Sequence, residues 1–321
     1  MQIPRISRRN ALSTTLKIAG LASLGVVAVR PEAAYADAAS KPDGRFRFCL
    51  NTATLRGHKL GIVKEVQIAA AAGYDSIEPW IESLDTYLQN GGSLSDLKKQ
   101  IADAGLTVES AIGFAEWAVE DNARRAKGLE RAKQDMETVA KIGGKRIAAP
   151  PAGATNQPRL DPGKAAERYR ALLDIGRQAG VLPQLELWGF SHNLNRLAEC
   201  VSVAMETGNR DACVLVDVYH LYKGGSDING IALLGPSAIQ VVHMNDYPAD
   251  PPREKIDDSL RVYPGDGIAP VVEILTLLQK TGGRKVLSLE LFNRKYWAED
   301  ALTVAKAGLA KMKAVAGKVP A

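Results

Sequence analysis

The chain has 321 residues, of which 46% are hydrophobic, and its formal net charge is +5. Five basic residues and one acidic residue lie in the first 36 positions, so the rest of the chain has 36 basic and 35 acidic residues. This nearly neutral remainder offers no broad basic surface, which argues against a nucleic-acid-binding function. Three cysteines are too few for a disulfide framework, and the hydrophobic fraction is sufficient for one large core.

Residues 1–36 have the pattern of an export signal. A basic start with Ser7-Arg8-Arg9 precedes an apolar run over residues 18–29, and Ala34-Tyr35-Ala36 matches an A-x-A cleavage site. The arginine pair resembles the twin-arginine export signal, and the apolar run is shorter than the roughly 20 residues that span a bilayer. We predict a cleaved leader over residues 1–36 and a mature chain over residues 37–321 in a periplasm or equivalent exported space, without stable membrane insertion. The alternative is an uncleaved anchor or a disordered start.

From residue 46 onward, strand patterns and helix patterns alternate without a break in composition. Short apolar runs rich in β-branched residues predict strands, and longer amphipathic runs that end at glycine predict helices. Ser93 and Asp161 are typical residues for the start of a helix. The predicted strands cover residues 47–51, 76–78, 106–112, 145–149, 182–187, 212–217, 239–243 and 285–290. The predicted helices cover residues 59–72, 84–104 with a restart at Ser93, 122–142, 162–179, 194–207, 228–234, 268–279 and 298–315.

Regular alternation of strands and helices is typical of a parallel sheet. Eight strands favour a closed barrel over an open sheet, so we predict an α/β fold with a single (β/α)8 TIM barrel after the export signal. The short segment after residue 217, with Gly224-Gly225, is predicted to be a loop. A polar loop is predicted over residues 245–264.

Four consecutive predicted strands end in a residue typical of metal ligands: Glu186, Asp217, His243 and Glu290. The carboxyl ends of barrel strands meet at one rim, so we expect these side chains to converge. Three carboxylates so close together would raise one another's pKa unless they share a cation. A set rich in oxygen with one nitrogen suits Mn²⁺, Co²⁺ or Mg²⁺, and Zn²⁺ is also compatible. The alternative is that the glutamates cap loops or pair with nearby cations and the histidine is a core residue.

These residues also resemble those of the xylose isomerase-like barrel family. Its pattern has Glu after strand five, Asp-x-x-His after strand six, His after strand seven and Glu after strand eight, and the likeness covers about residues 46–315. The resemblance implies that Glu186, Asp217, His243 and Glu290 bind one metal ion and that His220 contacts substrate. In the ketose epimerases of this family, the glutamates that match Glu186 and Glu290 also move protons on opposite faces of the sugar, which makes them the predicted catalytic pair.

The chain departs from the epimerase pattern at two positions. His192 stands where those enzymes have an acidic residue, and Ala249 stands where they have an arginine, so Arg253 or Arg261 would have to reach the substrate. Trp188 lies two residues after a predicted ligand and offers an aromatic face to a sugar ring. The predicted substrate-binding residues are His220, His192, Trp188, Glu78 and Arg253.

Three functions remain open, each with a small carbohydrate as the partner. The first is a metal-dependent isomerase or epimerase of a free sugar or keto-sugar, in which the ion stabilises an enediolate and the two glutamates move the α-proton. The second is a lyase that expels a β-substituent, as inosose dehydratases do, with His192 or His220 as the acid. The third is a saccharide-binding barrel without catalysis. The sequence is compatible with a monomer or a homo-oligomer.

Overall fold

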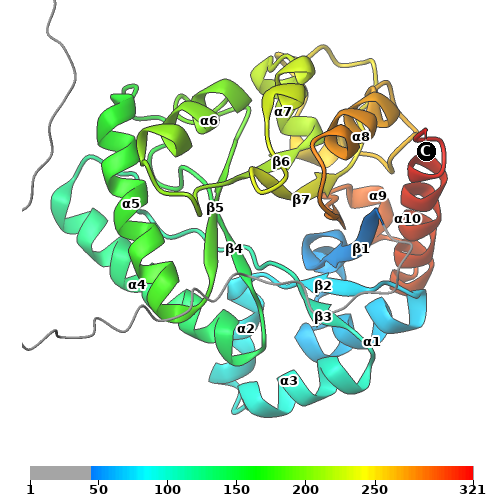
Figure 1. Ribbon diagram of the computed structural model, residues 1–321. Coiled ribbons are helices and arrows are strands. Elements are labelled where there is room, and N and C mark those ends of the chain that lie inside the picture. The colour runs from blue at the N-terminus through cyan, green and yellow to red at the C-terminus, as the bar shows by residue number, and fades with distance from the viewer. Residues whose placement is uncertain (1–44, 321) are drawn as a thin grey trace, which may run out of the picture. The chain divides into compact units, whose positions relative to one another are not determined.

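The computed structural model describes residues 45–320, which form an eight-stranded parallel barrel with helices around its outside (Figure 1). The predicted barrel is confirmed, whereas the predicted leader lies outside the described residues. The order of the strands in the sheet is β3-β2-β1-β8-β7-β6-β5-β4. The strands are β1 (Phe46–Asn51), β2 (Ser76–Glu78), β3 (Thr107–Val108), β4 (Arg146–Ala149), β5 (Leu182–Glu186), β6 (Val214–Asp217), β7 (Ile239–Met244) and β8 (Lys285–Leu289).

The barrel closes between β3 and β4 through a single residue. The backbone N–H of Ala111 donates to the Arg146 carbonyl at 3.1 Å, and the Ala111 carbonyl accepts from the N–H of Ala148 at 2.9 Å. The strand predicted over residues 106–112 is therefore regular over two residues only, and its remainder supplies these isolated bonds. This closure satisfies backbone groups that an open sheet edge would leave unpaired.

The helices follow the predicted pattern with local differences. The predicted helix over residues 84–104 is two helices, and the second begins at Ser93, whose hydroxyl accepts from the N–H of Asp96 as predicted for an N-cap. Asp161 caps helix α5 (Pro162–Ala179) in the same way, by accepting from the N–H of Lys164. The longer helices are α1 (Ile62–Ala72), α2 (Ile81–Gln89), α3 (Leu94–Asp103), α4 (Asn122–Lys141), α5 (Pro162–Ala179), α6 (Leu197–Glu206), α8 (Val271–Lys280) and α10 (Ala301–Ala316).

Several short helical segments were not predicted. The segment after β6, expected to be a loop, begins with helix α7 (Val218–Gly224), and Asp217 caps it by accepting from the N–H of His220 at 2.8 Å. The seven residues of α7 include a β-branched valine and three aromatic rings. The segment has neither the length nor the periodicity that predicts a helix. The other segments that were not predicted are α9 (Arg294–Trp297) and the 3-10 helices η1 (Thr52–His58) and η3 (Asp258–Leu260), whereas the 3-10 helix η2 (Ile228–Leu233) lies where a short helix was predicted.

Alternation along the strands decides which side chains face the barrel axis. Leu215, Val241 and Val286 belong to a small buried cluster that is separate from the larger shell between strands and helices. Because side chains on a strand alternate between its two faces, Asp217, two residues after Leu215, points the same way. The same spacing relates His243 to Val241. The barrel therefore directs its strand-end polar residues toward its own axis.

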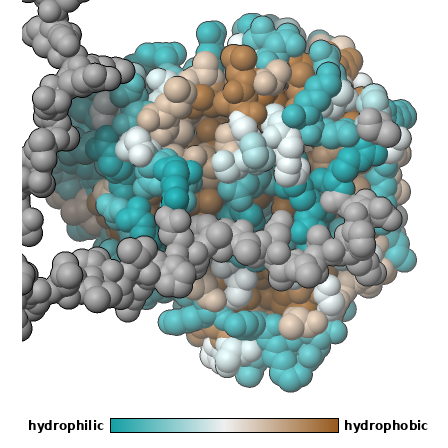
Figure 2. Space-filling view, viewed as in Figure 1, coloured by the Kyte–Doolittle hydropathy of each residue, from teal (hydrophilic) through white to brown (hydrophobic). Residues whose placement is uncertain are grey.

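The outer surface is mixed in character. Hydrophilic residues cover much of the outline of the face in Figure 2, and hydrophobic residues show nearer its middle. Among residues 45–320, no helix combines the length and apolar character needed to cross a membrane.

Candidate metal centre and active-site cavity

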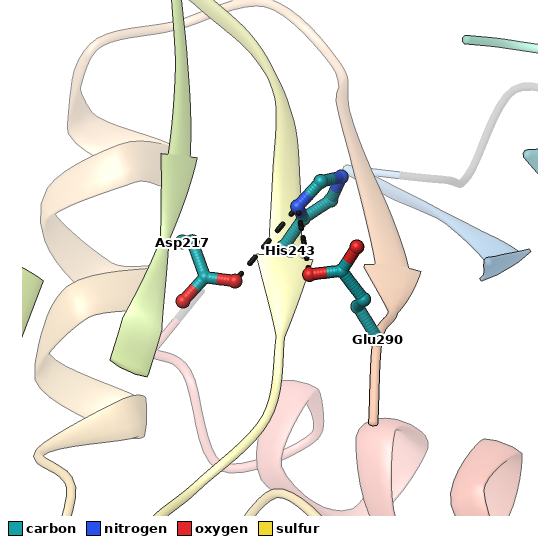
Figure 3. A group of neighbouring side chains, drawn as sticks. All are labelled: Asp217, His243 and Glu290. Atoms are coloured by element: carbon teal, nitrogen blue, oxygen red, sulfur yellow. Dashed lines mark ion pairs between the residues drawn. The ribbon is translucent and has the colours of Figure 1, made fainter. Parts of the chain in front are cut away.

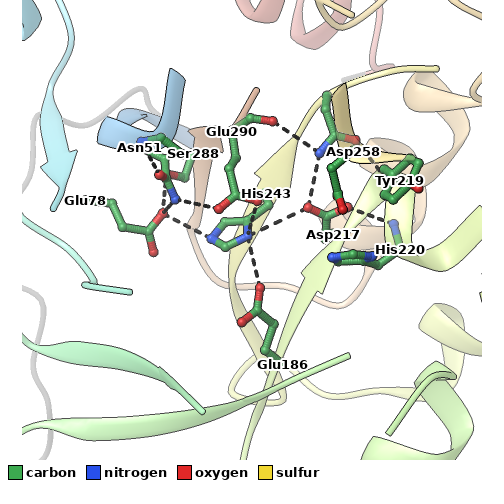
Figure 4. Close-up of polar contacts among 12 residues, drawn as sticks. Asn51, Glu78, Glu186, Asp217, Tyr219, His220, His243, Asp258, Ser288 and Glu290 are labelled. Atoms are coloured by element: carbon green, nitrogen blue, oxygen red, sulfur yellow. Dashed lines mark hydrogen bonds and ion pairs between the residues drawn. The ribbon is translucent and has the colours of Figure 1, made fainter. Parts of the chain in front are cut away.

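His243 lies at the centre of a cluster of buried acidic side chains (Figure 4). Its Nδ1 atom is 3.3 Å from Glu290 Oε2, 3.6 Å from Glu186 Oε1 and 3.8 Å from Asp217 Oδ2. The potential ligand atoms of Asp217, His243 and Glu290 all lie within 4.8 Å of one another (Figure 3). The structure thus brings together all four residues that the sequence singled out, on strands β5 to β8.

The charges in this cluster require compensation. Burial raises the pKa of Glu186, and the carboxylates of Glu290 and Asp217 raise it further against the opposing effect of His243. Burial alone would lower the pKa of His243, but the charges of Glu290 and Glu78 raise it well above its usual value. A cation with two charges would replace the proton on His243 and offset the repulsion among the three carboxylates.

Two buried atoms of the cluster fit a metal ion directly. Within the described part of the chain, His243 Nδ1 and Glu186 Oε2 have no hydrogen-bond partner. Buried polar atoms are almost always paired, and an orphaned imidazole nitrogen that faces carboxylate oxygens is the arrangement a divalent cation needs. The buried cluster of Asp217, His243 and Glu290 is therefore a candidate site for a divalent metal.

Glu78 lies behind the imidazole instead of facing a substrate. Its Oε2 atom is 3.1 Å from His243 Nε2 and also accepts from Ser288 Oγ at 2.6 Å and Asn51 Nδ2 at 3.0 Å. Glu78 was predicted to bind substrate hydroxyl groups, but it is fully buried and lies outside the lining of the cavity described below. Its carboxylate instead accepts the Nε2 proton, which leaves the Nδ1 lone pair directed at the cluster.

We expect Glu78→Gln to weaken the binding of a divalent metal by about 10-fold or more, because the carboxylate that orients His243 and increases its basicity is lost. Titration of metal-free protein with Mn²⁺, Co²⁺ and Zn²⁺, in competition with a chelator, measures this change. Glu137→Gln, at an exposed position on α4, is the matched control and should leave the affinity unchanged. Equal affinities for wild type and Glu78→Gln would contradict this role.

An arginine reaches the cluster from the long loop between β7 and α8. Arg261 Nη1 donates to Asp217 Oδ2 at 2.8 Å and to Glu290 Oε2 at 2.9 Å, while Nη2 contacts Asp258 and lies 3.1 Å from His220 Nε2. Its guanidinium also lies 4.6 Å from the ring centroid of Tyr219. Arg261 is thus held through both of its Nη atoms beside the potential ligands, with the Tyr219 and Phe292 rings against its guanidinium.

Arg253, the arginine predicted to bind substrate, lies elsewhere. It is exposed, and its nearest ionic partner is Glu254 at 3.7 Å. Of the two arginines that the sequence left as alternatives, Arg261 is the one that enters the site. The cis bond between Asp250 and Pro251 precedes Arg253 in the same loop.

The two histidines considered for substrate contact differ in position. His220 is buried and lines the cavity, and burial lowers its pKa despite the nearby charge of Asp217. His192 is exposed on the loop after β5, where its backbone N–H donates to the Thr155 carbonyl, and it lies outside the lining of the cavity. The expected contact between His192 and a substrate is therefore not supported by its position.

A cavity of about 310 Å³ opens above the cluster. Glu186, His220, Arg261 and Glu290 provide polar groups at one end. Aromatic rings form much of the remaining wall, and neighbouring rings contact one another, with centroids 5.4 Å apart for Trp188 and Phe190. The aromatic lining consists of Trp80, Phe114, Trp188, Phe190, Phe292 and Trp297. Flat rings on the sides and a polar floor suit a small molecule with hydroxyl groups and apolar C–H faces.

Some site residues had little or no signal in the sequence. Asn51 is the last residue of β1, just as the potential metal ligands lie at the ends of their strands. Its Nδ2 atom donates to Glu78 Oε2 at 3.0 Å and to Glu290 Oε1 at 3.1 Å, so it connects these two glutamates. Its position at a strand end is a signal that could have placed it among the main candidates. Phe114, Phe190 and Phe292 lie on loops, where no pattern indicates that they face the cavity.

Comparisons with known proteins agree with this fold. The family profile described as xylose isomerase-like TIM barrel matches residues 66–315. An inosose isomerase of Bacillus velezensis is 26% identical over 274 residues, which cover 81% of this chain and 94% of that protein. A 3-dehydroshikimate dehydratase of Pseudomonas aeruginosa is 25% identical over 254 residues, which cover 77% of this chain but 38% of that protein. Among solved structures, the IOLI protein with a bound zinc atom has a TM-score of 0.79 at 23% identity, with 86% of this chain and 99% of that chain covered.

Proposed function

Because the chain belongs to the xylose isomerase-like TIM barrel family, we propose that it is a divalent-metal-dependent isomerase or epimerase of a free sugar or keto-sugar. The observation that carries the proposal is the convergence of Glu186, Asp217 and Glu290 on the unpartnered Nδ1 atom of His243, at the floor of a cavity with aromatic walls. The similarity to inosose isomerases, which covers most of both chains, supports the same class of reaction.

Glu186, Asp217, His243 and Glu290 would hold the metal ion. Bound there, a divalent cation supplies Lewis-acid stabilisation of the negative charge that develops on the substrate oxygens in an enediolate. Three carboxylates and one imidazole suit Mn²⁺, Co²⁺ or Mg²⁺, and Zn²⁺, which the sequence also left as a candidate, is the ion bound in the similar IOLI structure.

The two glutamates are suited to move the α-proton. They come from β5 and from the end of β8 and approach the His243 ring from different sides (Figure 4). Both oxygens of Glu290 are held, by Asn51 and by Arg261, whereas Glu186 Oε2 has no hydrogen-bond partner among residues 45–320. With one carboxylate oxygen toward the metal ion, Glu186 would keep its other oxygen free to take a proton from the substrate.

The fate of that proton decides the product. If Glu290, after gaining a proton from solvent, delivers it to the same carbon from the opposite face while Glu186 keeps the first proton, the product is an epimer. If the proton returns to the neighbouring carbon and the hydroxyl proton passes from one substrate oxygen to the other, the carbonyl changes place and the product is an isomer. Arg261 positions Glu290 for either outcome, because its guanidinium holds one of the two carboxylate oxygens.

A second candidate is a lyase, favoured by the similarity to 3-dehydroshikimate dehydratases. The same α-proton would be removed, and the electron pair would expel a hydroxyl group from the β-carbon as water once that group has gained a proton. His220 is the candidate donor of this proton, because it lines the cavity and His192 does not.

The test is a screen of keto-sugars in D₂O with metal-free protein and with each candidate ion. We expect NMR to show that deuterium enters the α-carbon of an isomeric product only when a metal ion is present. Addition of a chelator should abolish this incorporation. A product that absorbs in the ultraviolet as a conjugated enone would establish the lyase instead. Saccharide binding without exchange or turnover under any metal would reject both enzymes in favour of a binding protein.

A further inference from the structure

A second, larger cleft lies beside the proposed active site. Its volume is about 570 Å³, and it lies among the residues of η1, α1 and α2, which follow β1 and β2 at the same end of the barrel as the cluster. Trp80 lines both this cleft and the metal-site cavity. None of the four potential metal ligands borders the cleft, so the proposed chemistry leaves it without a function.

A buried carboxyl group in this cleft has no partner. Glu65, in the first turn of α1, is 4% exposed, and its Oε2 atom is buried without a hydrogen bond to any residue that the structure describes. Burial raises the pKa of Glu65 to about 7. A ligand in the cleft that hydrogen-bonded to this carboxyl group would satisfy a buried polar atom that no described residue pairs. Ser83, Thr86 and Asn90 add hydroxyl and amide groups to the lining.

Trp80, which lies between the cleft and the metal-site cavity, is held by contacts that connect it to the metal cluster. Trp80 Nε1 donates to Asn51 Oδ1 at 2.9 Å, and the same asparagine donates to Glu290. On the cleft side, the Arg56 guanidinium lies 4.5 Å from the centroid of the Trp80 ring and pairs with Glu82 at 2.8 Å. On the cavity side, the ring contacts Phe114, with centroids 5.1 Å apart. Trp80 is the one residue common to the two linings, so a ligand that reached from one space to the other would contact it.

We infer that the cleft is a second binding subsite for an uncharged, hydroxyl-bearing group joined to a keto-sugar at the metal site, so that the substrate is a glycoside whose first ring carries the ketone that the proposed reaction needs. The cavity of about 310 Å³ is at the lower end of the range for small-molecule sites and suits one ring. A protonated carboxyl both donates and accepts hydrogen bonds, as paired hydroxyl groups require, and Arg56 is already neutralised by Glu82. The inference rests on the proposed function for the first ring and adds the second.

The test compares binding of D-glucose, cellobiose and gentiobiose to the metal-loaded protein by saturation-transfer NMR and by titration. We expect the two glycosides to bind at least about 10-fold more tightly than glucose, with saturation transferred to the second ring. Two variants probe the cleft: Glu65→Leu removes the carboxyl, and Thr86→Trp fills the space from an exposed position on α2. Both should reduce glycoside affinity to that of glucose and leave glucose binding unchanged.

The matched control is Gln89→Trp, which is exposed on the same helix outside the cleft and should bind glycosides as the wild type does. Equal affinities for glucose and the glycosides in the wild type, or equal losses for all three ligands in both cleft variants, would overturn the subsite. These experiments measure binding without turnover. Their result for the subsite can therefore be told apart from the result of the exchange experiment that tests the proposed reaction. Glycoside binding that depends on Glu65, without α-proton exchange, would reject the isomerase and support the subsite.

Discussion

Glu186→Gln and Glu290→Gln should each reduce α-proton exchange by about 10³-fold, within the range that general acid–base catalysis contributes. Each substitution keeps the size of the side chain and a carbonyl oxygen that can face the metal, but it removes a carboxyl group that takes the proton, at Glu186, or returns one, at Glu290. Exchange measured by NMR in D₂O on a reactive keto-sugar gives the rate. The loss for Glu186→Gln should be at least as large, because Glu186 Oε2 has no partner among residues 45–320 and is the proposed base.

The interpretation requires that the variants still bind metal. Metal content by emission spectroscopy separates a chemical defect from loss of the ion, and Glu254→Gln, at an exposed position on the loop after β7, is the control with wild-type exchange expected. Retention of exchange in both glutamine variants would exclude proton transfer by these residues. Loss of exchange in the Glu254→Gln control would show that the effect is not specific to the cluster.

Asp217→Asn and His243→Gln should abolish tight metal binding. In the wild type, a ligand present at 100 times its Kd stabilises the folded state by about 2.7 kcal/mol, so addition of metal should raise the Tm measurably. In the two variants this rise should disappear, and bound metal after dialysis should fall from about one ion per chain to a small fraction, because the cluster loses a carboxylate or its one imidazole. Calorimetric Tm values with and without metal, together with metal analysis, measure both effects.

Asp258→Asn is the matched control for this experiment. Asp258 contacts Arg261 at the edge of the cavity but is not one of the potential metal ligands, so its substitution should preserve the metal-induced rise in Tm. If Asp217→Asn bound metal as tightly as the wild type, the ion would lie elsewhere and the proposed centre would be wrong.

The sequence alone determined the barrel and the strand ends that point into it. Strand β2 was predicted with the bounds that the structure shows, and the ends of β5 to β8 were placed within a residue or two. Hydrophobic periodicity is a local property of the chain, and the alternation of strands and helices leaves few ways to arrange parallel strands. Because all these strands end at one rim, the convergence of Glu186, Asp217, His243 and Glu290 followed from their positions in the sequence.

Tertiary structure decided which other side chains join them. Glu78 contacts His243 across 165 positions of sequence, and its strand end alone could not distinguish an imidazole partner from a substrate hydroxyl. Arg261 and Arg253 lie in one long loop, and only the folded path of that loop brings Arg261 to Asp217 and turns Arg253 to solvent. Loops have no hydrophobic period, so long-range packing sets their conformation. The local pattern therefore determined the metal cluster, while the residues that orient it and enclose the cavity depended on the fold as a whole.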